Sequence, residues 1–290
     1  MPRDADELVE LLDLETIDTN LFRGRQAVTS LPRVFGGQAA AQAVVAAGRT
    51  VDPAYALHSL HSYFLQPGDT STPTIYDVET IRESRSFATR RVLARQHGRP
   101  IYALTADFQR PEESWEHQQA APTVPPPEEC LDPKPLLGQA PDDPEWGVMD
   151  VRYVGTSADD ALEPDDVRPG RQRVWLRARG RLPDDPFVHL AVFTYFSDMF
   201  LMGSALAPHG IRAGSREAMI ASLDHAVWFH RPFRADEWWL YDQDSPFAGG
   251  GRGLVHGRVH TPDGTLVASV SQEALLRKPR PQRPTASEDA

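Results

Sequence analysis

The stretch LHSLHSYFLQP at residues 57–67 recurs in altered form at residues 222–232 as SLDHAVWFHRP, and this repeat sets the architecture. The prolines that close the two stretches are 165 positions apart, and the glycines of two later turns, Gly98 and Gly264, are 166 apart. A period of this length is far above that of solenoid repeats, so it indicates a duplicated domain. The second copy carries polar residues where the first is apolar, and we expect the chemistry there.

Bulk properties narrow the class of protein. The length of 290 residues suits two domains that each bury their own core. The net charge of −11 argues against a general nucleic-acid surface. A single cysteine, Cys130, excludes an intrachain disulfide, and we expect a protein of the reducing cytoplasm. The apolar stretch 190–207 holds Asp198 near its centre, so we expect a buried core helix there and not a membrane span.

Composition divides the chain into two copies joined by a linker. Residues 121–145 are rich in proline and acidic residues, which is typical of a segment that lies over the surface without a core of its own. We expect one domain at residues 1–120, opening with a short acidic amphipathic helix, and a second at residues 146–278. Residues 279–290 are expected to be a disordered tail.

Each copy is predicted to contain one helix and several antiparallel strands. The alanine-rich residues 38–49 predict a helix that is packed on every side, and it follows two glycines that allow a tight turn into it. Alternating runs predict strands at 57–65, 74–83, 87–97 and 100–109 in the first copy, and at 172–179, 187–196, 217–230, 237–243, 252–261 and 265–276 in the second. This order predicts an α+β fold in which each sheet wraps around a helix.

Three polar residues of the second copy lie in apolar surroundings. Gln272 shares its strand face with apolar residues only, so alternation places its amide on the buried side, where the first copy has Ala106. Asp198 lies among aromatic and aliphatic residues, and we expect it at the start of a helix. Ser222 lies on the strand that opens the repeated stretch.

An acid, a hydroxyl and an amide can together hold one water molecule. The acid would take a proton from the water and the other two groups would fix its direction, while amides at the N-terminus of the second copy's helix would stabilise an oxyanion. Structural roles are the alternative: Asp198 as a helix N-cap and Ser222 as an ordinary strand serine.

Other motifs lack the context that their chemistry needs. His58 and His61 do not form an HExxH motif and have no cysteine partner, so neither a metal nor another cofactor is expected. The sequence contains no GxSxG elbow and no Walker A motif, and glycine-rich residues 249–253 lack the strand-then-helix setting of a dinucleotide loop. We expect these histidines in strand hydrogen bonds, with His58 close enough to the cleft to contact substrate.

The chain resembles the acyl-CoA thioesterase II family, whose members carry two hotdog domains in one chain. The resemblance covers about residues 8–278 and rests on LFRG (21–24), VFGGQ (34–38), HSLHSYFLQPG (58–68), SFATRRV (86–92), SD (197–198), LDH (223–225), WFHRPF (228–233) and SQE (271–273). It implies two hotdog domains forming a pseudo-dimer, and hydrolysis of fatty acyl-CoA to free acid and CoA without a covalent enzyme intermediate. The family's catalytic Asp, Thr or Ser, and Gln fall on Asp198, Ser222 and Gln272.

Two positions depart from the pattern of many members. Ser222 stands where many carry threonine; it keeps the hydroxyl but loses the methyl that restrains the rotamer, and we expect activity to survive. Ser84 stands where many carry glycine, in a turn whose Arg82 and Arg85 are expected to supply positive charge for the CoA phosphates. The resemblance also implies that double-hotdog chains pair further into a homo-oligomer.

Two other functional classes stay open at this point. A hotdog hydratase would need a catalytic histidine on the helix, and no histidine lies between Ala191 and Pro208. A non-catalytic acyl-CoA-binding protein also needs a cleft, but it has no need of a buried Asp-Ser-Gln set. A substrate saturation curve separates a binding protein from an enzyme.

Overall fold

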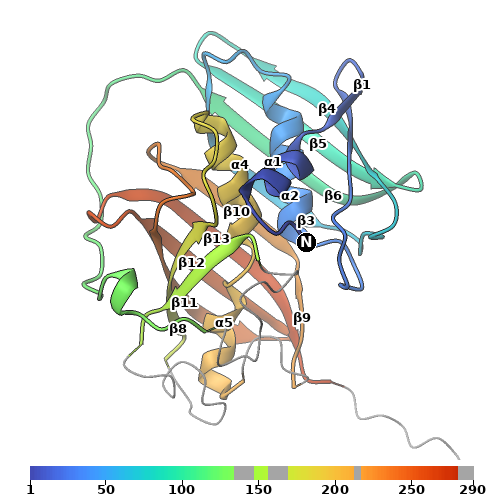
Figure 1. Cartoon of the computed structure of the whole chain (residues 1–290). Coiled ribbons are helices and arrows are strands. Elements are labelled where there is room, and N and C mark those ends of the chain that lie inside the picture. Colours follow the sequence, from blue (N-terminus) through green and yellow to red (C-terminus); the bar gives the residue numbers. More distant parts are fainter. Residues whose placement is uncertain (134–146, 156–168, 212–216, 280–290) are drawn as a thin grey trace, which may run out of the picture.

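The strands of both copies form one curved antiparallel sheet around two helices (Figure 1). The computed structural model describes residues 1–133, 147–155, 169–211 and 217–279. Residues 134–145 of the predicted linker and residues 280–290 of the predicted tail lie outside this part of the chain. The described part of the linker contains a short 3₁₀ helix, η1 (Pro127–Glu129).

The first copy contains each of its predicted elements and two further strands, β1 and β2, that were not predicted. It opens with α1 (Ala5–Leu12), the expected acidic amphipathic helix, whose first turn is capped by the Asp4 carboxylate. The long helix α2 (Gly36–Gly48) is buried around its circumference, as its alanine-rich sequence predicts. The strands are β1 (Glu15–Asp18), β2 (Leu21–Gly24), β3 (Ala56–Phe64), β4 (Thr74–Glu83), β5 (Phe87–Gln96) and β6 (Arg99–Gln109).

The second copy again surrounds a core helix with strands. Its helices are α4 (Pro186–Ser197), α5 (Met202–Leu206) and the short 3₁₀ helix η2 (Ala207–His209). Its strands are β7 (Met149–Tyr153), β8 (Arg171–Ala178), β9 (Met219–Ser222), β10 (Asp224–Phe229), β11 (Trp239–Gly249), β12 (Arg252–His260) and β13 (Leu266–Arg277). The predicted strand 217–230 is therefore two strands, interrupted at Leu223. The Leu223 backbone still bonds to the strands on both sides: its N–H donates to the Glu273 carbonyl at 3.0 Å, and its carbonyl accepts from the Phe64 N–H at 2.9 Å.

Residues 187–196 form a helix, so the strand predicted there is wrong. The helix begins with two favourable signals: Pro186 in its first turn and Asp185, whose carboxylate accepts from the Phe187 N–H at 2.9 Å. Its residues are apolar on every side and rich in aromatic and β-branched types, so the periodicity did not separate a buried helix from a buried strand. Asp198 consequently follows the end of α4 and does not start a helix.

The two copies share one sheet through the pairing of β3 with β10, in which Leu60 lies opposite Val227. The strand order is β1-β2-β4-β5-β6-β3-β10-β13-β12-β11-β8-β7, and β9 pairs with β13. Matching strands of the two copies thus lie at equal distances from the centre. Buried apolar residues of both copies form a single core cluster.

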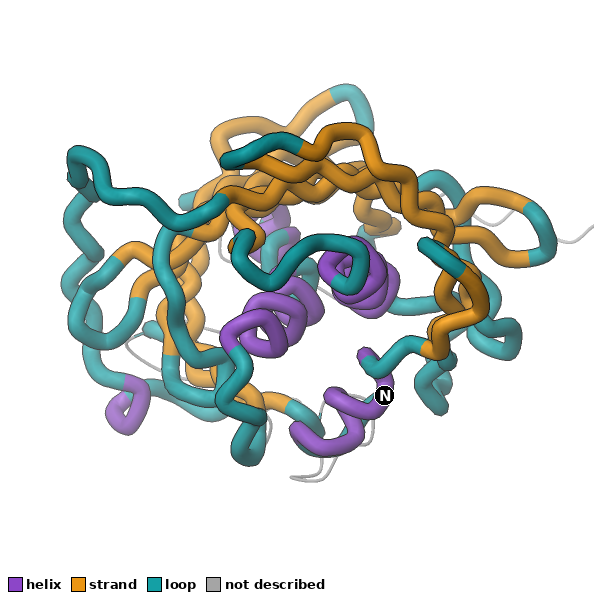
Figure 2. Tube along the Cα trace, turned by 90° about the horizontal axis from the view of Figure 1, so that it is seen from above, coloured by secondary structure: helices purple, strands orange, loops and turns teal. Residues whose placement is uncertain are grey.

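The helices α2 and α4 pack against each other inside the curve of the sheet (Figure 2). A Cβ on Gly37 would collide with the Tyr195 carbonyl near the end of α4, and a Cβ on Gly48 would collide with the Phe187 ring near its start. The two helices therefore run in opposite directions. The N-terminus of α2 meets the C-terminus of α4, which is where Asp198 lies.

The apolar segment 186–209 is long enough to cross a membrane by length and composition alone. Two thirds of its most apolar window is buried inside the protein (67%), and its two helices α4 and α5 are separated at Asp198. It forms core helices of the second copy, as predicted.

Candidate active site

The end of α4 presents the Asp198 carboxylate to the N-terminus of α2, across the boundary between the copies. Phe35 occupies the N-cap position of α2 and has no side-chain acceptor, so the first amides of the helix need other partners. The Gly37 N–H donates to the Asp198 carboxylate, and a Cβ on Gly36 would lie only 2.5 Å from Asp198 Oδ2. The positive end of the α2 dipole therefore faces this carboxylate.

This arrangement corrects the predicted placement of Asp198 at the start of its own helix. The residue occupies the C-cap of α4, where the helix dipole is unfavourable for an anion. The compensating amides come from the helix of the other copy. Sequence reasoning had treated Gly36 and Gly37 only as a turn into that helix.

Ser222 and Gln272 join Asp198 in one hydrogen-bonded cluster. Ser222 Oγ donates to Asp198 Oδ1 at 2.9 Å. Gln272 Nε2 donates to the same Oδ1 at 3.0 Å and to Ser222 Oγ at 2.9 Å. The register of β9 with β13, in which Ser222 lies opposite Ala274, brings the hydroxyl and the amide together. Gln272 is 1% exposed, so the predicted inward orientation of its amide is confirmed.

A second layer of buried side chains supports Gln272. His225 Nδ1 lies 2.5 Å from Gln272 Oε1, and His225 Nε2 lies 2.8 Å from Ser197 Oγ. His225 is 1% exposed and Ser197 is fully buried. The sequence analysis did not connect His225 with Gln272.

Burial dominates the electrostatics of the cluster. It raises the pKa of Asp198 to about 6, although the hydrogen bonds from Ser222, Gln272 and α2 and the charge of Arg33 act in the opposite direction. A carboxylate with this pKa is mostly ionised at neutral pH and still basic enough to take a proton from water. Burial also lowers the pKa of His225 to about 4, so its imidazole is neutral.

Arg33 is a contributor that sequence reasoning missed. Its side chain is exposed, and its guanidinium donates to the carbonyl oxygen of Ile220 at 3.0 Å, which ties the loop before α2 to β9. Its charge lowers the pKa of Asp198. Nothing in the local sequence around Arg33 indicates this neighbour, because Ile220 and Asp198 belong to the other copy.

The predicted substrate-binding histidine lies apart from this cluster. His58 Nε2 is 3.4 Å from the Asp107 carboxylate, and the His58 ring meets Phe87 edge-to-face. The neighbouring Leu60 of the same strand is fully buried and points into the core, whereas His58 is partly exposed. Its expected role in substrate binding stays a prediction.

Arg82 lies near the end of β4 and Arg85 lies in the β4–β5 turn, at the other end of α2. Arg90 donates both to the carbonyl of Arg82 at 3.1 Å and to the carbonyl of Thr50, just past the C-terminus of α2, at 2.8 Å. A helix of this length rises about 20 Å, so the turn is remote from Gly36 at the N-terminus. A contact of these arginines with CoA phosphates stays a prediction.

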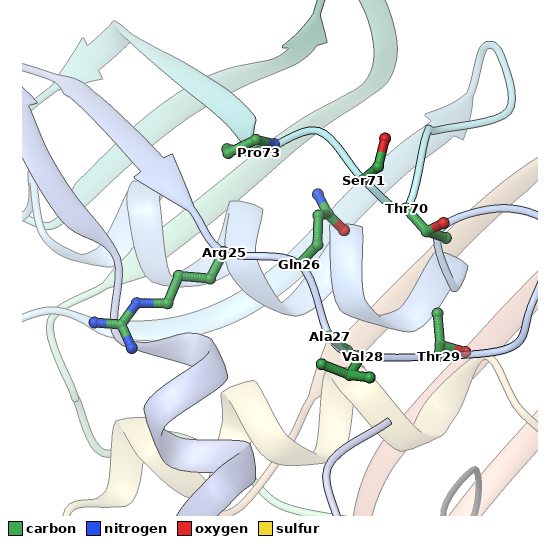
Figure 3. A pocket seen from close by; sticks show the side chains of 8 residues that line it. All are labelled: Arg25, Gln26, Ala27, Val28, Thr29, Thr70, Ser71 and Pro73. Atoms are coloured by element: carbon green, nitrogen blue, oxygen red, sulfur yellow. The ribbon is translucent and has the colours of Figure 1, made fainter.

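A pocket of about 450 Å³ lies beside α2 and outside the Asp198 cluster (Figure 3). Gln26 in its wall accepts a hydrogen bond from Gln38 of α2 at 3.0 Å. The remaining wall consists of Arg25, Ala27, Val28, Thr29, Thr70, Ser71 and Pro73. None of these residues belongs to the Asp198 cluster. The candidate site is therefore the hydrogen-bonded cluster of Asp198, Ser222 and Gln272, and not this pocket.

Comparison with known proteins gives a consistent result. Residues 162–275 match the family described as acyl-CoA thioesterase, and residues 27–109 match the acyl-CoA thioesterase N-terminal domain. The chain is 42% identical to human acyl-coenzyme A thioesterase 8, over 92% of this chain and 88% of that protein. It is 37% identical to acyl-CoA thioesterase 2 of Haemophilus influenzae, over 93% of this chain and 96% of that protein.

Solved structures give the same result for the fold. An acyl-CoA thioesterase II from Mycobacterium marinum is 46% identical and superposes with a TM-score of 0.80, over 93% of this chain and 98% of that one. A protein with hot dog fold from Alicyclobacillus acidocaldarius superposes with a TM-score of 0.76 at 22% identity, over 93% of this chain and 97% of that one. The expected α+β fold with hotdog domains is confirmed. The chain therefore belongs to the acyl-CoA thioesterase II family and is an acyl-CoA thioester hydrolase.

Proposed function

We propose that the enzyme hydrolyses fatty acyl-CoA by direct attack of water, with Asp198 as general base and with Ser222 and Gln272 orienting the water. One observation carries the proposal: a hydroxyl from β9 and an amide from β13 both donate to a single oxygen of the Asp198 carboxylate. A polar cluster in an apolar core costs stability, and such a cost is typical of functional sites.

The proposed step balances as a hydrolysis. The water oxygen bonds to the thioester carbonyl carbon while Asp198 takes one water proton. The tetrahedral intermediate then breaks its carbon–sulfur bond, and the departing CoA sulfur receives that proton from Asp198. The products are the free acid and CoA, and the carboxylate is ionised again.

The N-terminus of α2 supports a position for the thioester carbonyl. Its amides and the positive end of its dipole would stabilise the negative charge that develops on the carbonyl oxygen, and the Gln272 amide would assist. The sequence had suggested the helix of the second copy for this role. That helix, α4, begins twelve residues before Asp198, and Asp185 already caps its Phe187 amide.

Free-thiol release from a panel of acyl-CoA esters, short to long, tests the proposal with wild-type enzyme and Asp198→Asn side by side. Asparagine keeps the shape and one acceptor oxygen but cannot take the proton, so turnover should vanish while acyl-CoA still binds. Normal hydrolysis by Asp198→Asn would exclude Asp198 as the base. Binding without turnover by the wild-type protein would instead favour the non-catalytic acyl-CoA-binding alternative.

The homo-oligomer that the resemblance implies stays a prediction, which light scattering of the purified enzyme would test. The cytoplasmic location that the single cysteine suggests also stays a prediction, which fractionation would test.

A further inference from the structure

We propose that His225 is a positioning residue: its Nδ1–H, with Nε2 held by Ser197, fixes the Gln272 amide so that its N–H groups point at Asp198 and Ser222. The observation is a continuous chain of hydrogen bonds, 2.8 Å from Ser197 to His225, 2.5 Å from His225 to Gln272 and 3.0 Å from Gln272 to Asp198. The inference rests on the proposed function, since the orientation of the amide affects turnover only if Asp198 and its partners act on substrate.

The amide of Gln272 can occupy its site in two orientations, which exchange oxygen and nitrogen. In the present one, Nε2 uses both of its hydrogens, toward Asp198 Oδ1 and Ser222 Oγ. In the exchanged one, an amide oxygen would face the ionised carboxylate, two acceptors would oppose each other, and Asp198 would lose a donor. The charge of Asp198 therefore selects the present orientation from one side.

His225 selects the same orientation from the other side. Gln272 Oε1 can only accept, so Nδ1 must carry the single proton of the neutral ring, and Nε2 holds a lone pair. Ser197 Oγ lies 2.8 Å from Nε2 and 3.0 Å from the Thr194 carbonyl, and its one proton can serve either acceptor. When it donates to Nε2, every group from Ser197 to Asp198 has a complementary partner.

The opposite histidine tautomer is compatible only with the exchanged amide. Nε2–H would then donate to Ser197 Oγ, Ser197 would donate to Thr194, and Nδ1 would accept from the amide of Gln272. That arrangement places the amide oxygen against Asp198. The tautomer of His225 and the orientation of Gln272 are therefore coupled.

The duplicated sequence gives an independent argument. In the first copy Leu60 lies directly opposite Ala106 in the sheet, at the positions that correspond to His225 and Gln272 in the repeat. Leu60 and Ala106 are both fully buried. The imidazole and the amide thus occur together in the copy that carries Asp198, and both are replaced by apolar residues in the copy that does not.

The tautomer itself can be observed in the wild-type enzyme. Nitrogen-15 NMR of protein labelled at histidine distinguishes protonated from unprotonated ring nitrogens, and the His225 signals are those missing from His225→Asn. We expect a protonated Nδ1 and an unprotonated Nε2 at pH 7.5. A protonated Nε2 with a bare Nδ1 would overturn the proposal. This readout does not depend on turnover, so it stays separate from the Asp198→Asn test of the proposed function.

Kinetics of two variants test the consequence. His225→Leu copies the residue of the first copy and removes the donor, whereas His225→Asn keeps an N–H close to the position of Nδ1. We expect His225→Leu to lower kcat by about 10- to 100-fold with KM unchanged. Its acidic limb of kcat/KM should move to higher pH, because the Gln272 hydrogen bond that lowers the pKa of Asp198 is weakened when the amide is held from the Asp198 side only. His225→Asn should have most of the wild-type kcat, and its acidic limb of kcat/KM should lie at the wild-type pH.

The other groups near Asp198 do not change in these variants. Arg33 is the neighbouring cation, and Tyr102 and Tyr241 are buried tyrosines whose pKa burial raises far above the assay range. His260→Leu is the matched control, because His260 is also 1% exposed but lies on β12 outside the cluster; its acidic limb should stay at the wild-type pH. Equal losses in His225→Leu and His225→Asn, with unmoved limbs, would make His225 an ordinary core residue and overturn the proposal.

Discussion

Replacement of Gly36 by alanine should disable the enzyme without unfolding it. A Cβ at this position would lie 2.5 Å from Asp198 Oδ2 and 2.7 Å from Phe64 Cε1. The φ angle of Gly36 is not positive, so alanine is compatible with the backbone. Without the contact, alanine in a helix would stabilise the protein by about 0.4–1 kcal/mol. Two clashes therefore oppose the substitution, one with the Asp198 carboxylate and one with the Phe64 ring, and both groups must move aside.

The structure sets the size of the effect. Carbon and oxygen atoms that are not bonded to each other keep at least about 3.0–3.3 Å apart. The Asp198 carboxylate must therefore shift by about 0.5–0.8 Å, which would distort its hydrogen bonds of 2.9 and 3.0 Å with Ser222 and Gln272. A misplacement of about 1 Å costs on the order of 100-fold in rate, so we expect kcat/KM to fall by about 30- to 100-fold.

The assay is thiol release at limiting and saturating acyl-CoA, with calorimetry of the same samples. Gly48→Ala is the matched control on the same helix, because its Cβ would collide with the Phe187 ring, a packing contact remote from Asp198. It should lower Tm and keep the turnover of each folded molecule. A folded Gly36→Ala enzyme with wild-type kcat/KM would refute the reasoning that the carboxylate must sit against α2.

Further predictions concern the amide and the charge of the cluster. Gln272→Ala should lower kcat by about 100-fold while circular dichroism stays that of the wild type, because Ala106 fills the equivalent place in the first copy, although Tm should fall because the buried Nδ1–H of His225 loses its acceptor; loss of the fold would contradict this. The wild-type kcat/KM should fall about tenfold per pH unit below pH 6, where Asp198 takes up a proton, and a profile that stays flat to pH 5 would exclude this base. Folding raises the pKa of Asp198, so the folded state binds the extra proton and loses stability as pH rises from about 4 to about 6. Asp198→Asn should therefore raise Tm at pH 8 and not at pH 4, and an equal change at both pH values would contradict the burial argument.

The long helix and the four long strands of the first copy could be predicted because their signals are local, whereas the four-residue strands β1 and β2 are too short to show a period. The alanine-rich sequence of α2 and the alternation of β4, β5 and β6 each have one compatible period. Residues 187–196 could not be assigned in this way, since a stretch that is apolar except for His189 and Thr194 has too little contrast from which to read a period. The signals that could have placed the helix, Asp185 and Pro186, stand at its start.

The members of the candidate site could be predicted better than its position. Comparison of the copies singled out Asp198, Ser222 and Gln272, and the structure brings these three together. Their proximity to the N-terminus of α2 depends on the antiparallel packing of two helices from different copies, which no local pattern encodes. The pairing of His225 with Gln272 could have been predicted from the repeat, because the corresponding residues of the first copy, Leu60 and Ala106, are both apolar.

The symmetric order of the strands would allow a second site at the other end of the helix pair, where the end of α2 meets the start of α4. The residues at these two positions differ from those of the Asp198 site. At the end of α2 the C-cap is Arg49, in the place where α4 has Asp198. The guanidinium of Arg49 is turned to the carbonyl of Leu14 and the carboxylate of Asp13. A base is therefore missing at this end.

The amides are missing there as well. At the start of α4, Pro186 has no N–H, and the next amide is occupied by Asp185. The start of α2, in contrast, has no side-chain cap, and its Gly37 amide donates to Asp198. The two copies thus contribute different groups to the candidate site. The first contributes the N-terminus of α2, and the second contributes the carboxylate of Asp198, the hydroxyl of Ser222 and the amide of Gln272. Because neither copy holds all of these groups, the site depends on the contact between α2 and α4, and the two copies act as one catalytic unit.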